Sequence, residues 1–166
     1  MRKKYCGAEA ARLLRDAGIR SPPVDVRRVA NALLVHVRPV GPWDPRWRAR
    51  AKLRREVPEI IYNPQESRRA VRFSIAHELG HFLLHESLET FSEFEDPESP
   101  EYSADPRKEL ENEANYFASV LLVPPEWLRT DVKQGASVEE LVERYDVSRD
   151  VMFIALREHR LVEKLK

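Results

Sequence analysis

Two histidines and a glutamate stand together between Ala76 and His85 in an arrangement that can hold and use a metal ion. His77 and His81 are four residues apart, so on a helix their imidazoles lie one turn above each other and can reach one cation. Glu78 lies next to His77, close enough to exchange a proton with a water at that site without binding the metal. This His-Glu-x-x-His pattern is typical of zinc peptidases, and zinc suits two neutral imidazoles with a carboxylate. The segment therefore predicts a zinc site with Glu78 as general base.

A third ligand has to come from elsewhere in the chain. His85 is four residues beyond His81, but about 12 Å of helix rise separates it from His77, so one metal cannot be held at three successive turns. We expect His85 to cap the end of the helix or to pack against its neighbours.

A later helix, over residues 108–122, offers glutamates that could complete the site. Glu111 shares a face with the small residues Ala114 and Ala118, so this face can approach the first helix closely. Glu113 shares a face with bulky side chains and is typical of a core-facing position. We predict Glu111 as the third ligand, with Glu113 as the alternative.

Further residues are candidates for supporting roles. Asn115 lies one turn beyond Glu111 and could hydrogen-bond a ligating imidazole and set its tautomer. A tetrahedral oxyanion would need an additional donor, for which Tyr116, His159 and Arg72 are candidates that the sequence does not separate.

Periodicity and capping residues predict an α+β fold, with a small sheet early in the chain and helices before and after it. Helices are expected over 8–17, 26–33, 67–85 and 108–122 and after Ser137 and Ser148, and strands over 35–39, 52–56 and 59–62. Pro58 is expected to separate the last two strands. We hypothesise that residues 59–62 form an edge strand that holds an extended substrate by β-augmentation. The acidic segment 86–105 lacks a clear period and is interpreted as a loop, either a lid or exosite or a disordered insertion.

Length and composition are typical of one soluble globular domain over residues 1–166, with 42% hydrophobic and 34% charged residues. The longest apolar run, Val151 to Leu156, has six residues, far fewer than the roughly 20 that span a bilayer. No apolar signal-peptide core follows the basic start, so we expect a cytoplasmic protein without a membrane segment. The single cysteine, Cys6, excludes an internal disulfide and a cysteine-based zinc cluster.

Charge is unevenly distributed, with a net charge of +11 over residues 1–75 and −11 over residues 76–166. Either two charged faces attract each other, or the basic part binds an acidic or nucleic-acid partner. The same alternatives apply to the basic stretch 46–55 beside Trp43 and Trp47, which is interpreted as a charged edge hairpin or a nucleic-acid surface.

The C-terminal subregion, about 125–166, resembles a helix-turn-helix. It carries 8 Lys+Arg and 9 Asp+Glu, and its last helix presents the apolar run Val151 to Leu156 where a DNA-reading helix presents polar and basic side chains. We therefore predict a packing role or a protein contact through Met152 and Phe153 rather than direct binding of nucleic acid.

Three segments together resemble the ImmA/IrrE family of metallopeptidases. They are Pro22–Asp25, Arg69–His85 and Glu111–Pro124, and the resemblance covers most of the chain. It implies a gluzincin-like fold, with zinc between two helices beside a small sheet, held by His77, His81 and Glu111. Members of this family typically cleave a helix-turn-helix repressor and so switch on stress-response or mobile-element genes.

The sequence thus predicts a zinc-dependent endopeptidase, and the resemblance implies that its substrate is a helix-turn-helix transcriptional repressor. Mn²⁺ or Fe²⁺ could occupy the same ligands in place of zinc. The alternative is a non-catalytic regulator that binds DNA or a repressor protein. The oligomeric state stays open.

Overall fold

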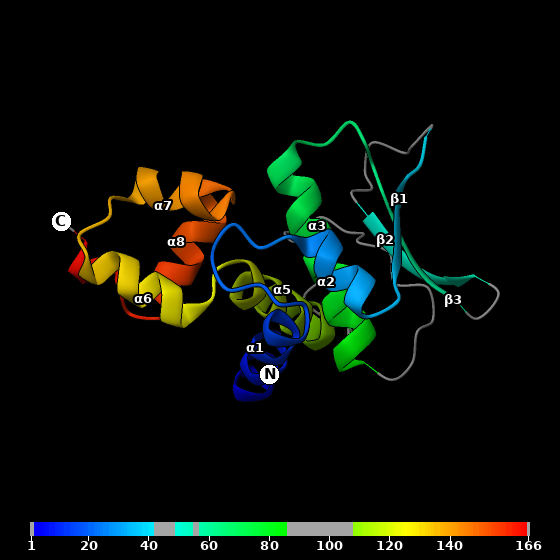
Figure 1. The fold of residues 1–166 in the computed structure, drawn as a ribbon, viewed down its shortest axis with the longest axis horizontal. Coiled ribbons are helices and arrows are strands. Elements are labelled where there is room, and N and C mark those ends of the chain that lie inside the picture. Colours follow the sequence, from blue (N-terminus) through cyan, green and yellow to red (C-terminus); the bar gives the residue numbers. More distant parts are fainter. Residues whose placement is uncertain (1, 42–48, 55–56, 86–107, 166) are drawn as a thin grey trace.

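The computed structural model describes residues 2–41, 49–54, 57–85 and 108–165. The acidic segment 86–105, Trp43 and Trp47 lie outside these residues, and of residues 49–54 and Val57 only the backbone is described. Figure 1 shows a small sheet at one end, the helices α3 and α5 in the middle, and a group of shorter helices at the other end.

The described strands form one three-stranded sheet in the order β1-β3-β2. β3 (Val57–Tyr62) runs parallel to β1 (His36–Pro39) and antiparallel to β2 (Ala49–Arg54). Residues 59–62 are therefore central and not an edge, and the hypothesis that they hold a substrate by β-augmentation is wrong because both of their sides are already paired. Pro58 lies within β3 instead of separating two strands. It is tolerated because the pairing of β3 with β1 begins only at Glu59.

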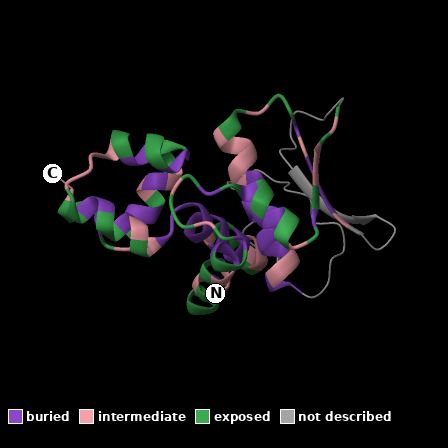
Figure 2. Cartoon of the chain, in the orientation of Figure 1, coloured by how far each residue is buried: buried purple, intermediate pink, exposed green. Residues whose placement is uncertain are grey.

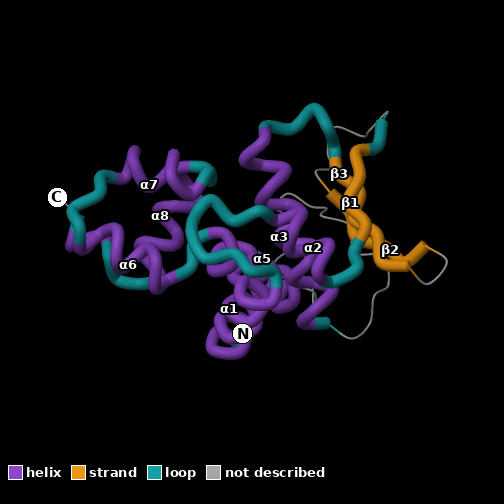
Figure 3. The backbone as a smooth tube through the Cα atoms, viewed as in Figure 1, coloured by secondary structure: helices purple, strands orange, loops and turns teal. Residues whose placement is uncertain are grey.

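The helices follow the predicted order, with one addition. They are α1 (Lys3–Asp16), α2 (Val26–Ala32), α3 (Arg68–Leu84), α5 (Lys108–Leu122), α6 (Pro125–Lys133), α7 (Val138–Tyr145) and α8 (Arg149–Glu158), followed by the short 3₁₀ helix η1 (Val162–Lys164). α6 was not expected, because the pair Pro124-Pro125 predicts only the end of the preceding helix. Pro125 in fact begins α6, since proline fits the first turn of a helix, where its missing N–H has no partner to lose. Figure 3 shows these helices and their connections.

Side chains cap the beginnings of four of the described helices, three of them at the predicted residues Asp25, Ser137 and Ser148. The side chain of Asp25 accepts from two backbone N–H groups of α2, and Ser67 and Ser148 each accept one from α3 and α8. Ser137 and Glu140 form the predicted capping box of α7. These local bonds satisfy donors that the first turn of a helix leaves unpaired.

α1 begins five residues earlier than predicted, because a tertiary contact defines its start. Arg2 precedes the helix and makes no side-chain cap. Its backbone N–H and its guanidinium both bind the carboxylate of Glu113 on α5, at 2.8 and 2.9 Å. The start of α1 is therefore anchored to α5.

The C-terminal helices are held to α3 through the turn between α7 and α8. Asp146 in this turn is buried and has a left-handed backbone conformation with φ 51°. Its carboxylate lies 2.7 Å from Arg68 Nη2 and 3.1 Å from Arg72 Nε, and Arg72 Nε also donates to the backbone oxygen of Asp146 at 3.0 Å. α8 is thereby placed beside the N-terminal half of α3.

The main apolar core lies where α3, α5 and α1 pack together, with α2 and β3 on the side of the sheet. Figure 2 shows the buried residues concentrated on the facing sides of these helices. Among the described residues, no helix is both long enough and apolar enough to cross a bilayer.

Candidate metal centre

The two central helices approach each other at a glycine. A Cβ on Gly80 of α3 would lie 3.1 Å from Ala114 Cα and 3.1 Å from Phe117 Cδ1 of α5, closer than carbon atoms pack without strain. Only glycine therefore permits this separation. The approach brings Glu111, one turn before Ala114 on α5, opposite the histidines of α3.

His77, His81 and Glu111 converge on one point, each with a ligand atom within 4.8 Å of the others. The two imidazole Nε2 atoms are 2.9 Å apart, and the carboxylate oxygens of Glu111 lie 3.2 Å from His77 Nε2 and 3.2 Å from His81 Nε2. Metal–ligand bonds of about 2.0–2.1 Å in a tetrahedron would place ligand atoms about 3.4 Å apart. The donor set therefore fits a zinc-sized ion with movements of a few tenths of an ångström.

The environment favours the protonation states that a cation needs. Burial, reinforced by the neighbouring histidines, lowers the pKa of His81, and Glu111 only partly opposes this. Burial alone would raise the pKa of Glu111, but its contacts with the two imidazoles outweigh burial and lower it. Neutral imidazoles facing an ionised carboxylate are the forms in which these groups bind metals.

Asn115 holds the first imidazole. Its Oδ1 lies 2.9 Å from His77 Nδ1, and an amide oxygen can only accept, so Nδ1 carries the proton. The lone pair of His77 is then on Nε2, the atom that faces His81 and Glu111. This is the contact that the spacing of Asn115 from Glu111 predicts.

His81, the second imidazole, contacts His85, which in turn lies close to Glu113. His85, at the C-terminal cap of α3, is buried, and its Nδ1 lies 3.0 Å from His81 Nδ1. Its Nε2 lies 3.6 Å from the carboxylate of Glu113, and hydrogen bonds and charge from Arg2 lower the pKa of Glu113 to about 2.

The sequence of contacts from Glu113 through His85 to His81 indicates which ring nitrogen of each histidine carries the proton. The ionised carboxylate of Glu113 favours a proton on the facing His85 Nε2, which leaves Nδ1 of His85 as an acceptor. With a metal bound, His81 Nδ1 would donate to His85 Nδ1 and the lone pair of His81 would be on Nε2, toward the metal; without a metal, the 2.9 Å contact between the two Nε2 atoms needs a proton on one of them. Glu113, the alternative ligand, thus lies away from the cluster and contacts His85 and Arg2 instead.

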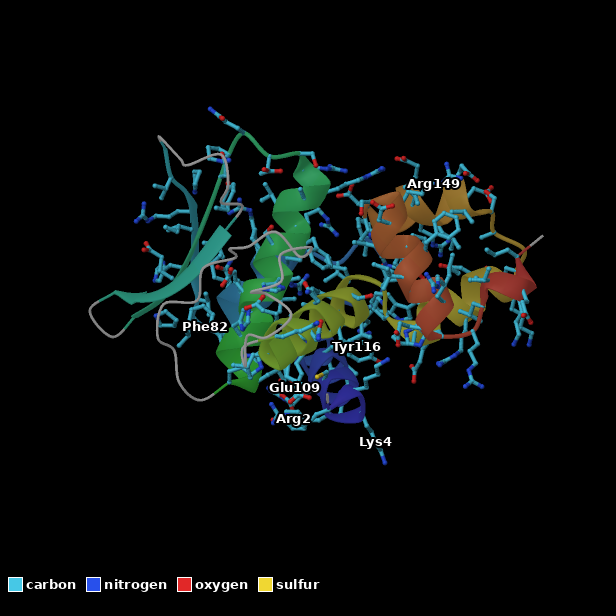
Figure 4. The ribbon with its side chains drawn as sticks, turned by 180° about the vertical axis from the view of Figure 1, so that it is seen from behind. Arg2, Lys4, Phe82, Glu109, Tyr116 and Arg149 are labelled. Atoms are coloured by element: carbon cyan, nitrogen blue, oxygen red, sulfur yellow. The ribbon has the colours of Figure 1, made fainter. Side chains whose placement is uncertain are left out.

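The sequence predicts His85 as a cap or packing residue and indicates no role for Arg2. His85 does occupy the cap position, but it also contacts His81. Its spacing of four residues from His81 is the signal that could have suggested this contact. Arg2 is 111 residues from Glu113 along the chain, and no local pattern links them. Figure 4 shows Arg2 beside the N-terminal part of α5, near Glu109.

Comparison with known protein families gives one match. The family model Peptidase M78, described as the IrrE N-terminal-like domain, matches residues 34–157. The chain belongs to this family. Comparison with curated proteins gives no match.

Membership of this family makes the chain a metallopeptidase of the ImmA/IrrE type. His77, Glu78, His81, Glu111 and Asn115 all lie within the matched residues. Glu78 follows His77 on α3 and is fully buried.

The three oxyanion candidates lie in different surroundings. Arg72 is engaged with Asp146 at the turn before α8. His159 lines a separate cleft with residues of α1 and α6, and its buried Nε2 has no hydrogen-bond partner among the described residues. Tyr116 is half-buried on α5 and lines a cleft together with Asn115, the residue that holds His77. Tyr116 also lines the cleft of His159, and of the three it is the one that shares a cleft with a residue in contact with a candidate ligand.

Proposed function

We propose that the chain is a zinc-dependent endopeptidase that cleaves a helix-turn-helix transcriptional repressor. The observation that carries the proposal is the convergence of two Nε2 atoms and one carboxylate from two helices on one point. Asn115 and His85 support it, because each contacts the Nδ1 atom of one of the two imidazoles. Such contacts hold the ligating nitrogen of an imidazole toward a metal.

Glu78 and Tyr116 have separate roles in the proposed hydrolysis. Zinc, when bound, supplies a Lewis acid that polarises the scissile carbonyl and lowers the pKa of water. Glu78 takes a proton from the attacking water as its oxygen bonds to the carbonyl carbon. When the C–N bond breaks, Glu78 delivers that proton to the leaving nitrogen. The hydroxyl of Tyr116 is our candidate donor to the oxyanion.

Glu78→Gln separates the proposed enzyme from a non-catalytic regulator. The amide keeps the size of the side chain but cannot accept the proton, so cleavage should fall by about 10²–10⁴-fold while zinc content stays at that of the wild type. Glu126→Gln, an exposed change in the first turn of α6, is the matched control and should cleave normally.

The assay combines metal analysis with mass spectrometry of candidate helix-turn-helix repressors incubated with and without chelator. The same metal analysis distinguishes zinc from Mn²⁺ or Fe²⁺. A wild-type protein that binds none of these metals would refute the proposal. Unchanged biological output from Glu78→Gln would favour a regulator that acts by binding. The repressor substrate, its role in stress response and the cytoplasmic location are part of the proposal and rest on the resemblance and the composition.

A further inference from the structure

The cleft that His159 lines lies between α1, α5 and α6. It encloses about 630 Å³, and none of the three candidate metal ligands lines it. Its α1 wall extends from Lys4 to Arg15, which is about 17 Å along a helix axis. Figure 4 shows Lys4 at the beginning of α1 and Tyr116, another lining residue, on the adjacent α5. The cleft is therefore about as long as three turns of helix.

The cleft is basic, and most of its cations have no counter-charge. Glu126 is the one carboxylate among the described residues that line it. Lys3 lines it as well and pairs with Glu158 at 2.5 Å. Further exposed cations line the cleft and make no ion pair within the described part of the chain: Lys4, Arg15, Arg20 and Arg129. Because no described carboxylate pairs with these cations, the cleft attracts an anionic partner.

Cations from two helices lie close to His159 at one end of the cleft. Burial lowers the pKa of His159, the charges of Arg129 and Lys3 lower it further, and Glu158 opposes this. Arg129 belongs to α6 and Lys3 to α1, so both walls bring positive charge to this end. An anion that lies between the walls would be attracted from both sides.

The floor between these charges is apolar, and Gly7 leaves open space in it. Gly7, Ala11 and Leu14 lie at helical spacing on one stripe of α1, and Val120 and Pro124 continue the floor. A Cβ on Gly7 would meet no atom within 4 Å, so no contact inside the described part of the protein requires glycine there. Glycine within a helix lowers stability relative to alanine. A partner packed closely against α1 would give this glycine a role.

Positive charges along two walls and an apolar floor match an acidic amphipathic helix. Such a helix lays its apolar face into a groove, and carboxylates beside that face would reach the cations of both walls. Trp127 of α6 lines the cleft and is only partly buried, and tryptophan is enriched where protein partners meet. A nucleic-acid backbone is charged along its whole length, so it would leave the aliphatic floor without an apolar partner.

We propose that this cleft docks an acidic amphipathic helix of a partner protein. Small or apolar side chains of the partner lie against Gly7 and Ala11, and its carboxylates face the unpaired cations of the two walls. The inference does not depend on the proposed peptidase function, because the cleft is lined by none of the candidate metal ligands.

Three labelled peptides and a duplex DNA test the proposal by fluorescence anisotropy with the full chain. Each peptide has about 12 helix-forming residues, long enough to span the cleft, with an alanine and leucine face flanked by glutamate, glutamine or lysine. We expect the glutamate peptide to bind at least about tenfold tighter than the glutamine peptide and tighter than the DNA, and the lysine peptide not to bind. The affinity for the glutamate peptide should fall as the salt concentration rises, because ions screen exposed charges.

Gly7→Leu fills the open space in the floor and should lower the affinity for the glutamate peptide by about tenfold or more. Leucine favours a helix more than glycine does, so α1 stays folded in this variant. Ala8→Leu is the matched control, because Ala8 is exposed on α1 and does not line the cleft. Arg129→Glu should lower the affinity by a similar factor. Its control is Lys133→Glu, the same charge reversal at an exposed residue of α6 that does not line the cleft.

Loss of affinity in Gly7→Leu and Arg129→Glu, with unchanged affinity in the two controls, would support the inference. Equal binding of the glutamate and glutamine peptides, no binding of the glutamate peptide, or unchanged affinity in either cleft variant would each overturn it. Tighter binding of the DNA than of the glutamate peptide would overturn it in favour of a nucleic-acid surface.

Discussion

Replacing Gly80 with alanine should weaken metal binding as well as the packing of α3 against α5. Gly80 does not bind the metal, but it determines how closely α3 and α5 approach each other. The added Cβ would lie 3.1 Å from Ala114 Cα and 3.4 Å from the Ala114 backbone oxygen. Because these atoms belong to the backbone of α5, the strain cannot be relieved by rotating a side chain.

The magnitude follows from the size of the required movement. Restoring ordinary contact requires a separation of a few tenths of an ångström. Glu111, one turn before Ala114, would move away from His77 and His81; the first part of this movement takes its oxygens from 3.2 Å to the tetrahedral separation of about 3.4 Å, and the rest lengthens the metal–ligand contacts, which tolerate only about 0.2 Å. We expect zinc affinity to fall by about tenfold, comparable to the loss of an orienting contact. For the fold, overpacking costs about 1–3 kcal/mol, and the gain in helix propensity offsets about 1 kcal/mol of that.

Zinc affinity is measured by competition with a chromophoric chelator, and stability by denaturant unfolding of the metal-free protein. Gly7→Ala is the matched control, because Gly7 also lies within a helix but a Cβ there meets no atom within 4 Å. It should stabilise the protein by up to about 1 kcal/mol and leave zinc affinity unchanged. If Gly80→Ala bound zinc as tightly as the wild type, the close approach of α3 and α5 would not be what positions Glu111.

Three other predictions concern side chains outside the ligand set. Arg2→Gln should lower zinc affinity by about tenfold in the same competition assay, because it removes the group that holds Glu113. Arg12→Gln, which breaks ion pairs within α1, is the control and should leave zinc affinity unchanged. Equal losses of affinity in the two variants would contradict the idea that Arg2 acts on His81 through Glu113 and His85. Since Arg2 lowers the pKa of Glu113 from 4.5 to about 2, their contact stabilises the metal-free protein above pH 4.5 and is lost as the pH falls toward 2. Thermal melts across this range should therefore show a smaller loss of stability in Arg2→Gln than in the wild type, and parallel losses would count against the pairing. Tyr145→Phe should lower the free energy of unfolding by about 1–3 kcal/mol, because the hydroxyl of Tyr145 donates to the buried carboxylate of Asp131 at 2.7 Å. Denaturant unfolding measures this loss. A loss below about 0.5 kcal/mol would show that the hydrogen bond adds little net stability.

Much of the candidate site could be predicted because its determinants are local. The spacing of His77 and His81 and the small residues around Glu111 need only the geometry of single helices. The cap at Ser67 and the capping box at Ser137 depend on bonds that reach no further than three residues along the chain. The family match covers two of the three segments on which the resemblance was based, Arg69–His85 and Glu111–Pro124.

Other features depend on which elements meet. Residues 59–62 form the central strand of the sheet, although their sequence is equally compatible with an edge, because strand order depends on long-range pairing. The carboxylates of Glu111 and Glu113, two residues apart on α5, differ in role only because α3 lies against one and Arg2 against the other.

The sequence by itself therefore indicated the candidate chemistry: two imidazoles and an adjacent carboxylate, specified by spacing along one helix, and a third candidate ligand on a later helix. Only the tertiary structure decided the surroundings of that chemistry. The separation of α3 and α5 at Gly80, the contact of Arg2 with Glu113 and the position of α8 beside α3 arise from packing between elements distant in sequence. Helical spacing relates residues three or four apart, and it carries no information about which distant surface will cover them.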